Sequence, residues 1–473
     1  MIRILVSVLT ILLLSSLAHA DIEWSGVYRF EGVLINDASL DEKGGTKEYG
    51  IHHLVLKPKI IIADAFQVNA RLDIMNGASD QTIHPNNQIG QDWGGSNSKN
   101  DQIYSSMGSN AGAEWVEVSQ LYMTYANNFG ALILGRAPLD FGLGMSYSSG
   151  DGLFDHWYDT RDLVGFKIHF GNIYVYPMYG KVNEGQGLSN SISESKEIMV
   201  QVEYNNEELK RRVGFFFSQR ESGRGEHDFP VLNAGQTLTD SLKRRGINFY
   251  YLQKYSKAKY GIELSYQNGR TGLVSGNSSV DLEGFGAAFE FDYYKENWST
   301  DFSIKMGYAS GDDKTTDDKV ESFIFNRNYN LGMLLFNHGL GQIDTLGVQR
   351  QYTRGYTIGT GVDNPSRIED YDVEAISNVF YFAPGMTYNF NDQWSLGGQI
   401  ITGFLLEDPE NITDGDASLG YELNITTTFK PNDHVHFGLD IAGFLPGGAF
   451  ENTDLNIDSG FTYGLMGKAA FSF

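Results

Sequence analysis

Apolar and polar residues alternate along most of the chain. In residues 66–74, for example, Val68 and Leu72 share one face, whereas Arg71 and Asp73 lie on the other. The same period of two recurs in residues 24–31, 198–204, 285–293, 302–308 and 419–429. Because side chains of a β-strand point alternately to its two faces, this period predicts strands with one apolar and one polar face.

The connections between these strands alternate between short and long. Short turns are expected at residues 64–65, 127–130, 171–172, 205–208, 256–258, 295–297, 391–393 and 430–433. Long polar connections are expected at residues 36–47, 77–112, 138–161, 183–195, 221–243, 269–280, 310–374, 405–417 and 446–461. A soluble sandwich has the same strand period, but this alternation is typical of tight periplasmic turns and long extracellular loops.

These connections join about eighteen strands, and the fold class that follows is all-β: a transmembrane antiparallel up-and-down β-barrel of 16–18 strands. A closed barrel is required because each unpaired backbone group in hydrocarbon costs several kcal/mol. At this size, side chains cannot fill the interior, so an aqueous channel is expected unless a loop narrows it.

The first twenty residues are typical of a secretory signal. Arg3 precedes an apolar run over residues 4–14, and the triplet 18–20 places small residues where a signal peptidase cuts. Residues 1–20 are therefore predicted to be a signal peptide, and residues 21–473 a single barrel domain located in the outer membrane.

Composition excludes several other classes. The chain has no cysteine and a formal net charge of −24, which removes thiolate sites and argues against nucleic-acid binding. The motifs of serine hydrolases and zinc proteases are absent from the sequence. We therefore expect no enzyme, metal or cofactor, and a run of aspartates at 312–318 is interpreted as a solvated loop rather than a Ca²⁺ site.

Charged residues of both signs lie on the predicted inner face. A ring of one sign would select ions of the other sign, and here neither sign dominates. Paired side chains that neutralise one another are an alternative interpretation, and Arg136 could equally anchor a loop. The candidates for lining the pore or its constriction are Arg71, Arg136, Lys167, Arg212, Arg220, Glu290, Asp292, Lys305 and Arg327.

The longest connection, residues 310–374, contains an unusually apolar stretch. Nine of the fourteen residues at 323–336 are apolar or aromatic, although a loop in water gains nothing from such side chains. We therefore predict that this stretch folds inward or packs on the rim and narrows the pore, with Arg327 facing the path. An additional pair of strands is the alternative.

Several stretches resemble the alginate-export family of outer-membrane porins. They are residues 120–125 with 134–136, residues 310–313, residues 419–423 and residues 443–447. The resemblance implies a barrel with a similar number of strands. It also implies a strongly electropositive lumen that suits a polyanion, and the mixed charges of this chain depart from that pattern.

The sequence thus predicts a passive outer-membrane channel, porin or exporter, for small hydrophilic or saccharide solutes. The expected partners are outer-membrane lipid and the barrel-assembly machinery, because a final strand that ends in Phe473 resembles the signal that this machinery reads. The alternative is a closed barrel that serves as a surface-binding or adhesion scaffold without transport.

Overall fold

The computed structural model describes residues 21–41, 45–63, 65–74, 116–182, 195–224, 236–237, 241–275, 278–294, 299–312, 318–348, 374–408, 413 and 415–473. The predicted signal peptide and residues 313–317 of the aspartate run lie outside these ranges.

Twenty strands form one sheet, and a single 3₁₀ turn, η4 (Gly448–Phe450), accompanies them among the described residues. The first half contains β1 (Asp21–Ile35), β2 (Lys47–Ala63), β3 (Phe66–Ile74), β4 (Val116–Asn127), β5 (Gly130–Pro138), β6 (Thr160–Phe170), β7 (Ile173–Val182), β8 (Ser195–Asn206), β9 (Arg211–Arg224) and β10 (Gln236–Thr237). The second half contains β11 (Ser241–Lys254), β12 (Ala258–Ser275), β13 (Ser278–Tyr294), β14 (Thr300–Ala309), β15 (Lys319–Val320), β16 (Val379–Asn389), β17 (Trp394–Leu405), β18 (Ser418–Asn432), β19 (Val435–Pro446) and β20 (Thr462–Ser472).

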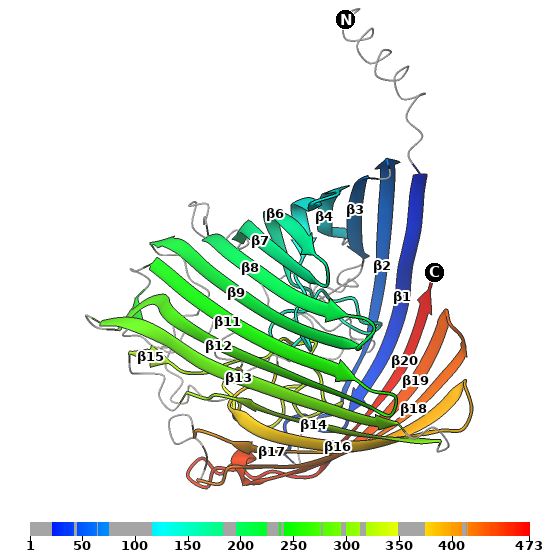
Figure 1. Ribbon diagram of the computed structural model, residues 1–473. Coiled ribbons are helices and arrows are strands. Elements are labelled where there is room, and N and C mark those ends of the chain that lie inside the picture. The colour runs from blue at the N-terminus through cyan, green and yellow to red at the C-terminus, as the bar shows by residue number, and fades with distance from the viewer. Residues whose placement is uncertain are drawn as a thin grey trace, which may run out of the picture.

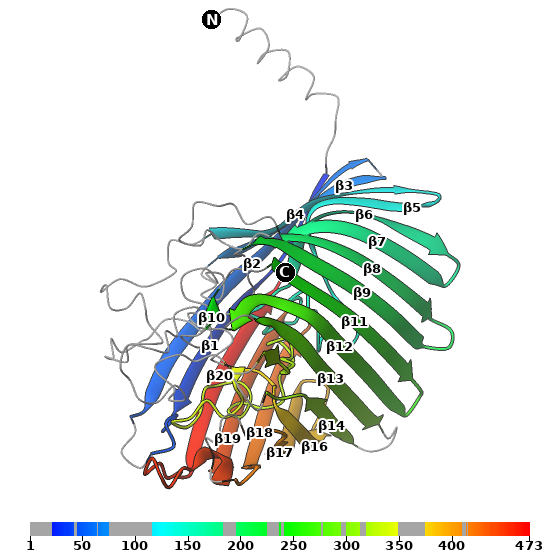
Figure 2. The ribbon, with the colours of Figure 1, turned by 90° about the vertical axis from the view of Figure 1, so that its left-hand side faces the viewer.

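The sheet closes on itself, as Figures 1 and 2 show. The short strands β10 and β15 are additions to the edge of the wall, and the remaining eighteen pair antiparallel in sequence order. Closure occurs where β1 pairs with β20, from Val27 opposite Ser472 to Ile35 opposite Gly464. The backbones of Gly26 and Phe473 exchange two further hydrogen bonds. The predicted closed barrel of about eighteen strands is confirmed.

The outer face of the wall is apolar. Large side chains that share this face are 36% to 61% exposed, among them Leu121, Ile198, Leu423 and Leu445. Aromatic residues gather at the short turns, where Trp394 stacks on Phe429 at 4.3 Å between ring centroids. Such a face suits lipid, with aromatic rings at the headgroup level. None of the described helices is long and apolar enough to cross a bilayer.

One predicted connection is wrong. Residues 269–280 were expected to form a long loop, but β12 continues to Ser275 and β13 begins at Ser278. The register shifts between Arg270 and Val274, and Gly269 has a φ of +145°. The glycine-rich composition that suggests a loop instead accommodates a β-bulge, because glycine adopts this backbone conformation without strain.

The interior contains a second layer of structure. The main hydrophobic cluster joins inner-face residues such as Tyr381 and Phe444 to Phe325, Met333 and Leu334 of the connection between β15 and β16. Figure 2 shows this connection, in yellow, inside the ring of strands. We call residues 139–159, between β5 and β6, the first inner segment and residues 322–348 the second inner segment.

Candidate functional site

Charged side chains on nearly opposite walls hold the first inner segment. On β12, the Glu263 carboxylate accepts hydrogen bonds from the backbone N–H groups of Leu143 and Met145 at 2.6 and 3.2 Å. On β3, Arg71 Nη1 donates to the carbonyl oxygens of Ser149 and Gly150 at 3.1 and 2.9 Å. Since β3 and β12 lie almost half a ring apart, the segment crosses the lumen.

Arg71 belongs to a buried charged cluster on β1, β2 and β3. Its guanidinium contacts Asp73 at 3.0 Å, and His53 Nε2 lies 2.7 Å from the same Asp73 oxygen. Arg29 contacts His53 and donates to the carbonyl oxygens of Leu153, at 3.0 Å, and of Asp155. A buried charge is tolerated only when its hydrogen-bonding groups are satisfied. The cluster therefore depends on backbone carbonyls of the first inner segment.

The second inner segment attaches differently. Its apolar side chains pack on the inner face of β16 to β20, and Phe325 is fully buried. One carboxylate fixes its backbone: Glu422 on β18 accepts from the N–H groups of Met333, Leu334 and Leu335 at 3.0, 3.0 and 2.6 Å. Glu422 is fully buried, and the three N–H groups supply both of its oxygens with hydrogen-bond donors.

The two inner segments meet inside the barrel. Asn326 Nδ2 donates to the Asp159 carboxylate at 2.8 Å, and Asn328 Nδ2 donates to the Trp157 carbonyl at 2.8 Å. The Arg327 guanidinium lies 3.6 Å above the centre of the Trp157 ring, a favourable cation–π contact. Together the two segments form one layer across the lumen.

The junction contains a perturbed carboxyl group. Burial raises the pKa of Asp159, and the nearby Arg161 guanidinium opposes this effect. The Asp159 carboxylate also accepts from the Ser148 backbone N–H at 3.0 Å. Burial likewise raises the pKa values of Asp140 and Asp155 in the same segment. The closed junction therefore favours protonated carboxyl groups more than open solution does.

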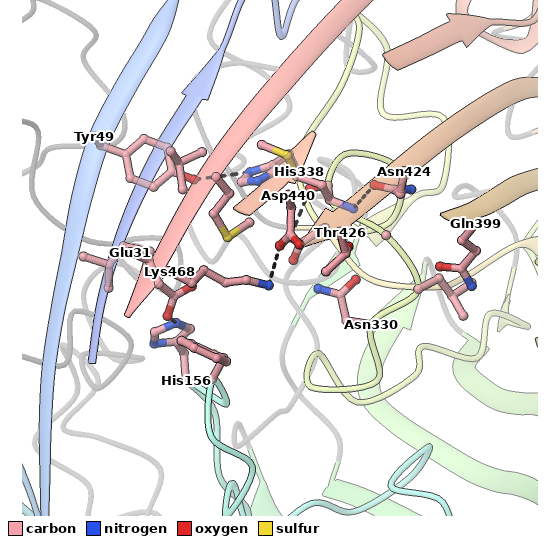
Figure 3. A pocket seen from close by; sticks show the side chains of 18 residues that line it. Glu31, Tyr49, His156, Asn330, His338, Gln399, Asn424, Thr426, Asp440 and Lys468 are labelled. Atoms are coloured by element: carbon pink, nitrogen blue, oxygen red, sulfur yellow. Dashed lines mark hydrogen bonds and ion pairs between the residues drawn. The ribbon is translucent and has the colours of Figure 1, made fainter. Parts of the chain in front are cut away.

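A cavity of about 310 Å³ remains between the two segments and the wall of β1, β2 and β17 to β20. Figure 3 shows its polar lining, in which His156 of the first segment contacts Glu31 at 2.9 Å and Lys468 contacts Asp440. Its other labelled residues are Tyr49, Asn330, His338, Gln399, Asn424 and Thr426. The cavity thus combines paired charges with amide and hydroxyl groups.

Most of the residues predicted to line the pore project inward. The inner face carries Arg71, Lys167, Arg212, Arg220, Glu290, Asp292 and Lys305. Arg212 contacts Glu203 at 3.0 Å, and Lys305 lies 3.7 Å from Glu290. Lys167 lies 3.6 Å from the centre of the Tyr174 ring. These inward charges are therefore largely engaged with neighbours on the wall.

Arg136 and Arg327 lie elsewhere. Arg136 shares the outward face of the wall with Leu134 and Val164, at the outer end of β5, and contacts Asp162 at 2.8 Å. It is therefore not included in the interior site. Arg327 lies in the second inner segment, at the junction described above.

Sequence reasoning placed Arg71 on the inner face but did not identify the first inner segment or its attachment to Arg71, Arg29 and Glu263. Alternation places Arg29, Glu263 and Glu422 on the polar face of their strands, but their partners are backbone groups far away in the chain. Nine of the twenty-one residues at 139–159 are apolar or aromatic, but glycine, serine and aspartate separate them, so the stretch resembles an ordinary exposed loop. Among the described residues, no group of three or more His, Asp or Glu side chains could hold a metal ion.

The fold of the chain is similar to that of several solved structures. The chain resembles Acinetobacter baumannii OccAB1 at 11% identity and a TM-score of 0.51, with 96% of both chains covered. It resembles Pseudomonas aeruginosa OccK2 (OpdF) at 10% identity and a TM-score of 0.50, with 96% of this chain and 98% of that chain covered. The outer membrane channel DcaP of Acinetobacter baumannii matches at 10% identity and a TM-score of 0.44, over 96% and 97%. These likenesses concern the fold.

Sequence comparison identifies the family. No curated protein matches the chain, but the sequence profile of the family described as Alginate export matches residues 201–458. This match covers more than half of the chain, from β8 to the residues after η4, and includes three of the four stretches that carried the resemblance. A closed eighteen-strand wall with an apolar outer face agrees with it, and the chain therefore belongs to the alginate export family of outer-membrane β-barrels.

Proposed function

We propose that this barrel is a passive channel, a porin or exporter, for small hydrophilic or saccharide solutes. The observation that carries the proposal is that two inner segments meet across the lumen and leave a polar cavity between them. An eighteen-strand barrel is otherwise too wide to discriminate between small solutes. A layer attached to buried groups on several strands provides the narrow, shaped path that discrimination requires.

The long connection between β14 and β16, residues 310–374, takes part in this narrowing. Its described part, the second inner segment, is held by Glu422 and by apolar packing rather than by water-exposed contacts. The first inner segment adds a second side to the constriction. Residues 349–373 lie outside the described residues, so the proposal rests on the segment before them.

The charges along the proposed path favour solutes of low net charge. Inner-face carboxylates and cations pair with each other, as Glu290 does with Lys305 and Glu203 with Arg212. Paired charges create a weak net field, whereas export of a polyanion calls for a positive one. We therefore favour small saccharides over a charged polymer.

Single-channel conductance tests the proposal. Deleting residues 320–340 should raise the conductance of the mature barrel in planar bilayers, because the deletion removes most of the second inner segment and therefore one side of the constriction. Substituting Leu423, which projects outward from β18, by Ala provides a control that should leave conductance unchanged. An unchanged conductance after the deletion contradicts narrowing. A silent wild-type barrel favours the alternative, a surface-binding scaffold without transport.

We also propose that the barrel is cut after residue 20 and assembled through its final strand. Phe473 lies next to the closing pair of strands, where its backbone bonds to Gly26. Deleting Phe473 should reduce the yield of assembled barrel in the outer membrane, measured by heat-modifiable mobility. The mass of the purified protein would reveal whether it begins at Asp21.

A further inference from the structure

We infer that the cavity between the inner segments is a binding site for a neutral polyhydroxylated solute the size of one sugar ring. The inference rests on the proposed channel function and specifies the solute that the constriction recognises. The cavity volume of about 310 Å³ lies at the lower end of the roughly 300–1,000 Å³ typical of small-molecule sites. The site therefore accommodates a small solute rather than a folded or branched polymer.

The charges of the cavity are internally balanced. Lys468 is the one lysine or arginine among the described lining residues, and its ammonium group contacts Asp440 Oδ2. Glu31 is engaged by His156 at 2.9 Å. Arg29 and Arg71 on the nearby wall donate to backbone carbonyls of the first inner segment. An anionic solute would therefore find no uncompensated cation in the described lining.

Asp440 has a carboxylate oxygen that a solute hydroxyl could satisfy. Its side chain is 8% exposed, and its second oxygen, Oδ1, is buried without a hydrogen-bond partner. A carboxylate accepts hydrogen bonds and cannot donate them, so a buried carboxylate oxygen needs an N–H or O–H group from its surroundings. A sugar hydroxyl supplies that donor. A carboxylate or phosphate group on the solute would instead bring a second negative charge.

The remaining lining fits a sugar ring. The lining residues Val33, Met333 and Met466 are buried and apolar, and they offer a surface to the C–H groups of a ring. Asn330, Gln399 and Thr426 line the same cavity and offer amide and hydroxyl groups. Amides and hydroxyls both donate and accept hydrogen bonds, which matches the dual character of sugar hydroxyls.

Two probe sugars test the class of solute. Methyl glucoside and methyl glucuronide share one ring and differ in whether carbon 6 carries a hydroxyl or a carboxylate. Binding of each to the mature barrel in detergent would be measured by saturation-transfer NMR titration. We expect methyl glucoside to bind at least about tenfold more tightly than methyl glucuronide. The glucuronide carboxylate cannot donate a hydrogen bond to the charged Asp440, and loss of such a bond lowers affinity by about this factor. Equal affinity, the reverse order, or a cavity that binds neither sugar would overturn the inference.

Variants locate the site. Asp440→Asn should weaken methyl glucoside binding about tenfold, because it removes the charge of the acceptor. Asn330→Ala should weaken binding about threefold or more, and the exposed Asn330 side chain makes this change safe for folding. The matched control is Asp162→Asn, the same chemical change on the outward face of β6, which should leave affinity unchanged. Unaltered binding in both Asp440→Asn and Asn330→Ala would contradict the assignment.

Conductance separates failure of this site from failure of the channel. If the wild-type barrel conducts but does not bind methyl glucoside, the site is wrong and the channel stands. If it binds the sugar and is silent, the channel is wrong and the site stands. If both hold, methyl glucoside should interrupt single-channel current, and Asp440→Asn should shorten these interruptions.

Discussion

The two inner segments reach the same lumen by different physical means. The first inner segment packs Phe141 and Met145 on the interior, but its backbone is held by buried charges, Arg71 and Arg29 on one wall and Glu263 on the other. The second is held mainly by apolar side chains such as Phe325, with Glu422 as its one carboxylate anchor among the contacts described above. Attachment through the backbone depends less on side-chain identity than apolar packing does.

The comparison explains why only one segment is visible in the sequence. Nine apolar or aromatic residues in the fourteen at 323–336 are unexpected in water and indicate burial. In residues 139–159 the signature is weaker, because the nine apolar or aromatic residues are spread over twenty-one positions among glycine, serine and aspartate. The wall also binds carbonyl and N–H groups of this segment, which every residue other than proline possesses. The predictions below test whether the two kinds of attachment are independent.

Arg71→Ala should have the largest effect, and it should act on the first inner segment. It removes two hydrogen bonds to backbone carbonyls and leaves Asp73 buried beside fewer partners, at a cost of about 3–5 kcal/mol. Amide hydrogen exchange would show faster opening of the first inner segment than of Met333 to Leu335. Lys243→Ala is the control, because its exposed pair with Glu221 is worth about 1 kcal/mol or less. Equal loosening of both segments by Arg71→Ala would show that they are not independent.

Glu422→Gln should release the second inner segment instead. Glutamine keeps one oxygen acceptor and replaces the other by an N–H₂ group, so at least one of the three N–H groups loses its partner. We expect a loss of about 1–3 kcal/mol, seen as faster exchange at residues 333–335 and a higher single-channel conductance. Glu208→Gln, the same chemical change at the exposed turn between β8 and β9, should leave exchange at residues 333–335 unchanged.

Arg327→Ala should weaken the junction between the segments. The guanidinium lies 3.6 Å above the Trp157 ring, and such a contact contributes about 0.5–2 kcal/mol. We expect more open-channel current noise while exchange at the wall anchors stays unchanged. Arg327→Lys should fall between wild type and Ala, because lysine retains the charge but not the planar group. Noise equal to that of wild type in Arg327→Ala would remove this contact from the mechanism.

The smallest effect should be a pH dependence centred on Asp159. Burial raises the pKa of this group in the closed junction, so the closed form binds a proton more readily than the open form does. The junction should therefore gain stability as the pH falls through the raised value, and the gain should be complete below about 4, the value of an exposed aspartate.

Current noise measured between neutral and acidic pH should accordingly decrease with acidification. Asp159→Asn should reduce the slope, and the remainder should come from Asp140 and Asp155, whose pKa values burial also raises. A slope that is identical in wild type and Asp159→Asn would contradict the role of Asp159.

Individual residues show where sequence reasoning stops. Alternation correctly places Arg71, Lys167 and Glu290 on the inner face, because inward and outward positions of a strand differ in polarity. Arg136 lies at the end of β5 on the outward face. At the rim a charged side chain can reach water from either face, so its polarity does not show which face it occupies. Residues 269–280 continue two strands through a bulge, because glycine permits either a turn or a bulge.

The sequence by itself determined the closed wall. The period of two and the alternation of short and long connections can be recognised strand by strand, and the cost of unpaired backbone groups in lipid requires the strands to close into a ring. Only the tertiary structure decided what occupies the lumen. Glu263 and Glu422 meet the N–H groups of the inner segments more than 80 residues away in the chain. Such contacts form only when the whole ring of strands is closed. The sequence around a buried carboxylate is the same whether the carboxylate binds a solute, a cation or a backbone amide, so the sequence does not identify the partner.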